Sequence, residues 1–180
     1  MTALNIKLKN IDWIPALFLT FTPVAAVGLS IWFFATQSFQ WWMAGLFLFF
    51  YVTSIFSISA GYHRLFAHCA YEVPSWLKLI LLLFGAATFQ NSAYKWAVDH
   101  RFHHRFVDTD QDPYTINKGF FYAHIGWVFF KEEEQYKNNF VPDLAKDKWV
   151  AWQHKHYLSI AVIVGFVIPL IIGWLMGNAW

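Results

Sequence analysis

Histidines are the residues of this sequence whose spacing points most directly to chemistry. There are eight of them, and five fall into two short groups, HRLFAH from His63 to His68 and HRFHH from His100 to His104. On a helix, His100, His103 and His104 project within an arc of about 100°, because residues three and four apart are neighbours on one face. Three imidazoles on one face, with no sulfur nearby, suit iron, zinc or copper.

The first histidine group is less regular than the second. His63 and His68 are five residues apart, so on an ideal α-helix they point about 140° away from each other. They can bind one metal only at a frayed helix end, or if the metal approaches from the side. A single histidine at a membrane surface is more often an interfacial residue than a metal ligand. Three on one helical face, beside a second pair, favour a metal site.

The remaining histidines carry weaker signals. His124, in YAHIGW, is alone in an apolar setting and is expected to make a structural hydrogen bond. His154 and His156, in QHKHY, precede an apolar stretch and could act as ligands, but an interfacial role is the favoured interpretation.

A run of aspartates invites a different metal, calcium. Asp108, Asp110 and Asp112 have the spacing of the first positions of a calcium-binding loop. The interpretation fails because Pro113 stands where that loop needs glycine and Gly119 where it needs glutamate. We expect a solvated turn here instead.

Membrane-spanning helices must position these histidines. The chain is 58% hydrophobic and 13% charged, and it has no Lys, Arg, Asp or Glu between Asp12 and Arg64 or after Lys155. Runs of this length indicate bilayer crossings. The predicted spans are residues 14–34, 41–61 and 158–177. Residues 79–94 would cover only about 24 Å, short of the hydrocarbon thickness of about 30 Å, and are expected to form a helix that does not cross.

Charge sets the expected orientation and excludes some functions. Lys7 and Lys9 precede the first span, and most other basic residues lie between the second and third, so the positive-inside rule puts the histidines in the cytoplasm. Basic residues are scattered among acids, which excludes a nucleic-acid surface. Cys69 is the only cysteine, which excludes an intrachain disulfide and a thiolate metal cage. The fold class expected is an all-α integral membrane protein, a transmembrane helical bundle with a cytoplasmic histidine-box region, forming one domain over residues 1–180.

The two histidine groups resemble those of a known family. HxxxxH at the end of a span followed by HxxHH is similar to the pattern of membrane fatty acid desaturases. The surrounding segments GYHRLFAH, QNSAYKWAVDHRFHHRFVDTDQDPY and KGFFYAHIGW look like the delta-9 acyl-CoA desaturase branch. The resemblance covers nearly the whole chain, and the paired boxes are its specific part.

The resemblance implies a non-haem di-iron centre at the cytoplasmic mouth of a four-span bundle. His63, His68 and His104 would bind one iron, and His100 and His103 the other. The implied activity is dioxygen-dependent desaturation of a long-chain acyl-CoA or other acyl thioester, in unsaturated fatty acid biosynthesis. An external donor, either a ferredoxin-like protein or a b-type cytochrome with its reductase, must supply both electrons, because the chain has no flavin, haem or iron–sulfur motif.

The resemblance also implies a set of substrate-binding residues. Asn91, Trp96 and Asp99 match positions near the thioester and head group, and Tyr51 matches the position that closes the far end of the acyl tunnel. Ile55 lies one turn nearer the metals on the same face as Tyr51. Their alternative interpretations are a helix-cap amide for Asn91, interfacial aromatics for Trp96 and Tyr51, and a salt-bridge acid for Asp99.

Three departures from the family pattern bear on the function. Animal relatives have arginine at the position of Val98, and a basic pair at the positions of Lys131 and Glu132, where cations contact the CoA phosphates. The fourth span and a third box, HxxHH, are missing, so we expect a truncated chain that is inactive alone. The alternatives are another membrane histidine-box oxygenase, such as an alkane or carotenoid hydroxylase, and a non-catalytic membrane protein that binds metal.

Overall fold

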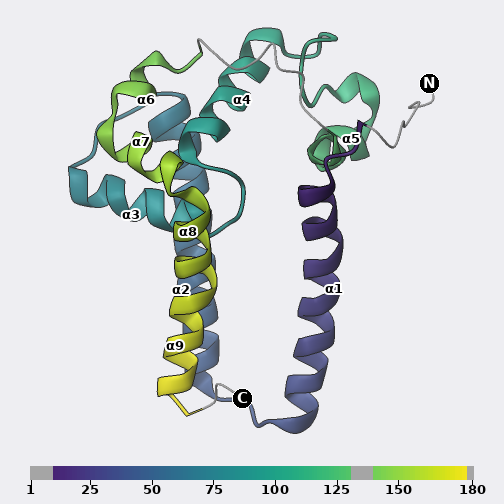
Figure 1. Cartoon of the computed structure of the whole chain (residues 1–180), viewed down its shortest axis with the longest axis vertical. Coiled ribbons are helices and arrows are strands. Elements are labelled where there is room, and N and C mark those ends of the chain that lie inside the picture. The colour runs from purple at the N-terminus through teal and green to yellow at the C-terminus, as the bar shows by residue number, and fades with distance from the viewer. Residues whose placement is uncertain (1–9, 131–139, 178–180) are drawn as a thin grey trace. The chain divides into compact units, whose positions relative to one another are not determined.

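The computed structural model of the chain describes residues 10–130 and 140–177. These residues are almost entirely helical, which confirms the all-α fold class (Figure 1). Within the described part of the chain, three helices are long and apolar enough to cross a membrane, and they correspond to the three predicted spans: Trp13–Thr36, Trp41–Ala67 and Tyr157–Leu175. The rest of the chain buries few of their residues, as expected of helices whose apolar surface meets lipid.

The spans differ in how regular they are. The first is a single helix, α1 (Trp13–Thr36), which begins where the Asp12 carboxylate accepts a hydrogen bond from the Ile14 backbone N–H. The second consists of α2 (Trp41–Phe56) and the π-helix η2 (Ser57–Ala67), which follow each other without a break. The third consists of α8 (Tyr157–Val162), η6 (Ile163–Val167) and α9 (Ile168–Leu175).

Shorter helices connect the spans. The apolar helix predicted over residues 79–94 is α3 (Ser75–Ala86), which is too short to count as a span. It begins four residues earlier than expected, at Ser75. It also ends earlier than expected, because residues 87–92 form a turn with Phe89 and Asn91 at positive φ. The others are α4 (Ala93–Phe106), η3 (Ile116–Lys118), α5 (Phe120–His124), η4 (Gly126–Phe129), α6 (Pro142–Lys146) and α7 (Lys148–Lys155).

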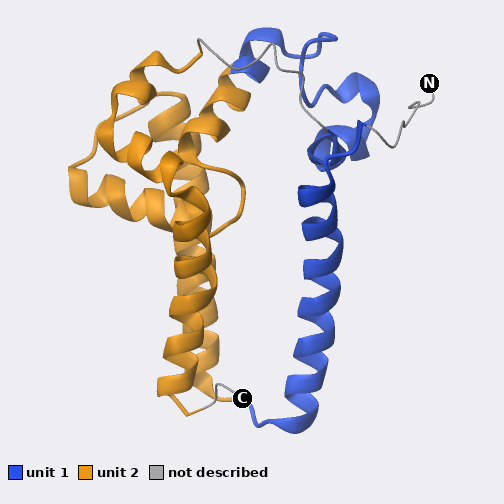
Figure 2. Ribbon diagram, in the orientation of Figure 1, with its two compact units in different colours: residues 1–39, 102–136 blue, residues 40–101, 137–180 orange. Residues whose placement is uncertain are grey.

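The chain divides into two compact units (Figure 2). Unit 1 contains residues 1–39 and 102–136, and unit 2 contains residues 40–101 and 137–180. The division falls after Arg101, inside the continuous helix α4.

Unit 2 has the larger buried core, built where η2 packs against α3. Tyr62 and Leu82 are fully buried there. The two helices approach closely at Gly85, where an added Cβ would lie 2.3 Å from Cε1 of Tyr62. The buried face of α7 completes this core through Val150.

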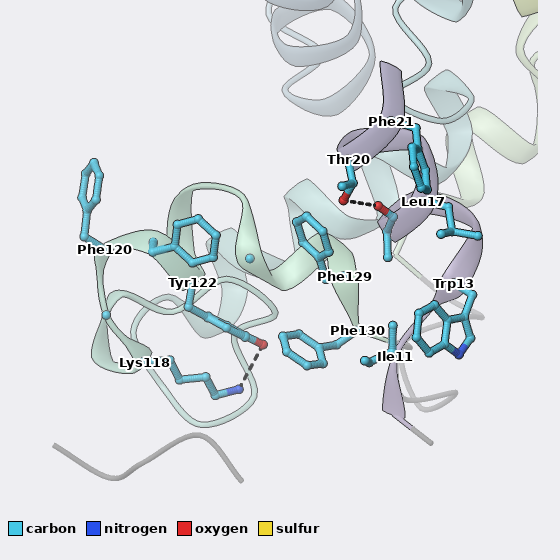
Figure 3. A pocket seen from close by; sticks show the side chains of 14 residues that line it. Ile11, Trp13, Leu17, Thr20, Phe21, Lys118, Phe120, Tyr122, Phe129 and Phe130 are labelled. Atoms are coloured by element: carbon cyan, nitrogen blue, oxygen red, sulfur yellow. Dashed lines mark hydrogen bonds between the residues drawn. The ribbon is translucent and has the colours of Figure 1, made fainter. Parts of the chain in front are cut away.

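Unit 1 packs η4 against the beginning of α1. The Asp12 backbone N–H donates to the Phe129 carbonyl at 2.9 Å. Beside this contact lies an apolar pocket of about 770 Å³, lined by the first turns of α1 and by residues 118–130 (Figure 3). Trp13, Phe21 and Tyr122 are among its aromatic residues, and none of the predicted substrate-binding residues lines it.

Candidate metal centre

Four of the five boxed histidines come together. His63 lies in η2, His68 is the residue that directly follows η2, and His100 and His104 lie one turn apart on α4. The Nε2 atom of His68 is 3.1 Å from that of His63 and 3.0 Å from that of His100. One ligand nitrogen from each of the four histidines lies within 4.8 Å of the others. The rings of His63, His68 and His100 stand nearly perpendicular to one another, so their nitrogens converge edge to edge.

The π-helix explains how two histidines five residues apart can converge. The His68 backbone N–H donates to the His63 carbonyl at 3.0 Å, an i to i+5 hydrogen bond. This wider turn places the two residues on one side of the helix, whereas an α-helix would separate them by about 140°. The sequence predicted that this convergence needs a frayed helix end or a metal that approaches from the side. In the structure, a continuous helix with a different period brings the two residues together.

The chemistry of this donor set fits a transition-metal ion. Imidazole nitrogens bind such ions at about 2.0–2.1 Å, so two ligands at right angles around one ion are about 3.0 Å apart. The two measured Nε2–Nε2 distances, 3.1 and 3.0 Å, match that spacing. Imidazole suits iron, zinc, copper and nickel, and calcium or magnesium would require oxygen ligands.

Trp96 forms a wall beside the cluster. It lies one turn before His100 on α4 and stacks on that imidazole, with ring centroids 4.7 Å apart and an angle of 27°. Its edge also meets His63 at 6.0 Å and Tyr62 at 6.2 Å. The indole thus covers one face of the His100 ring and restricts its rotation.

Arg101, which sequence reasoning missed as a functional residue, ties the two histidine-bearing helices together. Its guanidinium donates to the carbonyls of Phe66 and Ala67 at the end of η2, at 2.9 and 2.8 Å. It also forms two 2.7 Å hydrogen bonds with the Asp143 carboxylate. These bonds hold the pKa of Asp143 below its usual range. Its position between the histidines of HRFHH was the feature of the sequence that could have indicated a role for Arg101 near the cluster.

His103 lies apart from the four-histidine group. Its Nδ1 is 2.9 Å from Oδ1 of Asp112, and its ring stacks on Tyr114 with centroids 4.1 Å apart. Asp112 is 1% exposed and also accepts hydrogen bonds from the backbone N–H groups of Asp108 and Tyr114. The expectation of a solvated turn is therefore wrong for Asp112, which is the buried centre of this turn. A carboxylate bonded to Nδ1 leaves the Nε2 lone pair as the metal-binding site of a histidine.

The predicted head-group residues are found in a turn and in the first part of α4. Asn91 is exposed and has a φ of 74°, and its backbone N–H donates a hydrogen bond to the Tyr157 hydroxyl at 3.0 Å. The cap of α4 is its neighbour Ser92, whose hydroxyl accepts from the Lys95 N–H, so Asn91 is not the cap amide. Asp99 forms an ion pair with Lys95 at 2.6 Å.

The predicted tunnel residues lie on α2. Tyr51 and Ile55 are 54% and 47% exposed, and Tyr51 stacks on Phe47 with centroids 5.7 Å apart. Val98 is buried in the core of unit 2, and Lys131 and Glu132 lie outside the described residues.

The three weaker histidine candidates lie outside the cluster. His154 is bonded through Nδ1 to the Ser92 hydroxyl at 2.7 Å and lies against Tyr94. His156 lies against Trp152. His124 is exposed and stacks on Phe120, and the hydrogen bond expected for it is not found among the described residues.

Three bilayer-length helices and a cluster of four imidazoles define a multi-pass helical membrane protein with a histidine cluster. No family model matches the chain. The chain is 43% identical over 131 residues to a probable acyl-CoA desaturase of Schizosaccharomyces pombe, covering 72% of this chain and 27% of that protein. It is 36% identical over 162 residues to a delta-9 fatty-acid desaturase of Caenorhabditis elegans, covering 87% and 47%. It is 38% identical over 136 residues to an acyl-CoA delta-12 desaturase of Acheta domesticus, covering 71% and 38%.

These similarities agree with the resemblance in the histidine boxes. Over most of its own length the chain is homologous to the acyl-CoA desaturases, delta-9 enzymes among them, which confirms the resemblance noted in its histidine boxes. The chain spans less than half the length of each of the three relatives described above.

Proposed function

We propose that this chain supplies iron-binding histidines to an oxygen-dependent desaturase of long-chain fatty acyl thioesters. The observation that carries the proposal is the convergence of His63, His68, His100 and His104 within 4.8 Å, from two boxes more than thirty residues apart. Homology to acyl-CoA desaturases supports the substrate class. The alternatives, a hydroxylase of alkanes or carotenoids and a metal carrier, have no comparable support.

The reaction proposed removes one hydrogen from each of two adjacent methylenes. Dioxygen, two electrons from the external donor and two protons, together with the two substrate hydrogens, give the alkene and two molecules of water. A bound pair of non-haem irons would supply the oxidising power, which amino-acid side chains lack. His103, oriented by Asp112, would bind the second iron from outside the four-histidine group.

Protein residues around the histidines have the remaining tasks. Trp96 holds His100 by stacking on its ring. Asn91 and Asp99 would bind near the thioester, and Tyr51 and Ile55 would meet the methyl end of the chain. A delta-9 position for the double bond rests on the resemblance of the boxes, because delta-12 enzymes are also among the relatives.

A chimera tests this proposal. The chain would replace the matching 47% of the C. elegans delta-9 desaturase and be expressed in a yeast strain that lacks its own desaturase. We expect growth without added unsaturated fatty acids and monounsaturated products by gas chromatography. His100→Ala should abolish both, whereas His124→Ala, which changes an exposed histidine outside the cluster, should not. A chimera that reaches the membrane and binds iron but makes no alkene would contradict the proposal.

The chain on its own is expected to bind iron poorly and not to desaturate. Five boxed histidines cannot complete the ligand sets of two irons, and a metal site missing ligands loses affinity. Iron content of the purified chain, measured by mass spectrometry, checks this expectation. Tight binding of two irons per chain would contradict it, and would point to His154 and His156 as further ligands.

A further inference from the structure

Gln153 is a fully buried polar residue at the centre of unit 2. It lies on α7 and has no exposed surface. Its Nε2 donates to the Tyr62 hydroxyl at 2.6 Å and to the Leu82 carbonyl at 3.3 Å. Its Oε1 accepts from the Ala93 backbone N–H at 3.1 Å. One side-chain amide thus connects α7 to three other helices.

Two of these partners lie on the helical segments that carry the clustered histidines. Tyr62 precedes His63 in η2, and Ala93 is the first residue of α4, two turns before His100. The Ala93 N–H is one of the donors that a helix leaves unpaired at its N-terminus, and it is buried. Gln153 therefore satisfies the beginning of α4 and the hydroxyl of η2 with the two ends of one planar amide.

We infer that Gln153 is a positioning residue, which fixes the register of η2 against α4 and thereby the distance between His68 and His100. The inference rests on the proposed function, because the histidine cluster is the site it serves. A buried donor or acceptor that loses its partner incurs the full cost of desolvation, so the amide accepts only a narrow range of placements for its neighbours. Hydrophobic contacts between η2 and α3 permit small sliding motions, whereas this set of hydrogen bonds opposes them.

A matched pair of variants separates positioning from general stabilisation. Gln153→Met keeps the volume and flexibility of the side chain but removes all three hydrogen bonds. Val150→Ala, also fully buried on α7, removes apolar contact without touching the amide network. Tyr62→Phe removes only the hydroxyl, and it is the variant to use in the same test if Gln153→Met fails to fold.

The first measurement needs no metal. Hydrogen–deuterium exchange of the 180-residue chain in lipid nanodiscs would be followed in peptides from η2, α3 and α4. In Gln153→Met we expect exchange about tenfold faster at residues 62–68 and 93–97, as for local opening after loss of a buried hydrogen bond. Tyr62→Phe should show the change in η2 alone. Equal acceleration in all helices, or the same pattern in Val150→Ala, would overturn the inference.

The second measurement reads the cluster itself. Cobalt(II) added to the chain should give visible absorption bands from imidazole coordination, and Gln153→Met should change their intensity while Val150→Ala leaves them unchanged. Identical spectra in the two variants and the unmodified chain would overturn the positioning role. If the unmodified chain gives no such bands, its four clustered imidazoles do not hold the ion without the remaining ligands, as expected for iron, and the exchange experiment decides the role of Gln153.

Discussion

At the scale of single residues, the arrangement of the histidine cluster depends on side chains outside the cluster. Arg101 shows this most clearly, because its guanidinium fills the space between the end of η2 and the Asp143 carboxylate. The carbonyls of Phe66 and Ala67 have no helical partner at that end of η2, so Arg101 takes the place of the next turn.

Replacing Arg101 with methionine should therefore destabilise unit 2. We expect a loss of about 2–3 kcal/mol, because charge-assisted hydrogen bonds to carbonyls are removed from a half-buried site. Asp143→Asn should cost less than about 1 kcal/mol, because the Asp143 side chain is 44% exposed. Chemical unfolding in detergent, followed by tryptophan fluorescence, measures both. Equal losses in the two variants would show that the Arg101–Asp143 ion pair, and not the capping of η2, carries the stability.

Acid provides a second check on the same pair. The Arg101 hydrogen bonds lower the pKa of Asp143 in the folded chain, so the folded state binds fewer protons than the unfolded state as the pH falls. The stabilisation is complete above the unfolded pKa of about 3.9 and is lost as the pH falls toward the lower folded value. The corresponding decrease in the free energy of unfolding at low pH should be absent in Asp143→Asn.

Chain-length selectivity is also a property of single residues. Ile55 is β-branched and stiff, so it cannot turn aside for extra methylenes if its face lines the acyl tunnel. Overpacking such a slot costs about 1–3 kcal/mol, which gives roughly five- to hundredfold discrimination. We expect the complete enzyme to prefer palmitoyl over stearoyl chains, and Ile55→Ala to shift preference toward the longer chain with unchanged iron content. An unchanged ratio of sixteen- to eighteen-carbon products from the chimera would mean that this face of α2 lies outside the tunnel.

At the scale of elements, the sequence predicted spans better than it predicted helix types. Uncharged runs of about twenty residues are rare outside membrane-spanning helices, so the three crossings could be predicted from the sequence. The π-helix η2 was not, because an eleven-residue segment such as SISAGYHRLFA fits both helical periods. For the same reason the sequence did not predict that His63 and His68 converge; it predicted only that they must do so to bind one metal. The buried roles of Asp112 and Gln153 depend on contacts across nine and more than fifty residues, which periodicity does not carry.

The contact between η2 and α3 gives a prediction for an element. Gly85→Ala should cost about 1–3 kcal/mol, because the new methyl overlaps the buried ring of Tyr62. Gly45→Ala is the matched control: it also lies in an apolar helix, but nothing lies within 4 Å of its added methyl. It should be neutral or stabilising by up to about 1 kcal/mol. Thermal unfolding of both variants checks this, and a neutral Gly85→Ala would mean that Tyr62 has room to move.

At the scale of the whole molecule, the orientation of the second span determines which face of the membrane carries the histidines. α2 and η2 form one helix of 27 residues from Trp41 to Ala67, which is long enough to cross the hydrocarbon core of a bilayer. Its two ends therefore meet opposite surfaces of the bilayer. Cys69 follows the histidine end, and Ser38 precedes the other.

The single cysteine makes this testable. Cys69 is exposed and lies next to His68, so it reports the side on which the cluster faces. We expect a membrane-impermeant maleimide to label it in inverted vesicles but not in intact cells, because the positive-inside rule places the cluster in the cytoplasm. Ser38→Cys, made together with Cys69→Ser, should give the opposite result.

Partial burial raises the pKa of the Cys69 thiol, and the thiolate is the reactive form. Labelling should therefore accelerate from pH 7 to pH 8.5, and the comparison of the two vesicle orientations belongs at the higher pH. Labelling of Cys69 from outside intact cells would invert the topology and separate the cluster from a cytoplasmic electron donor.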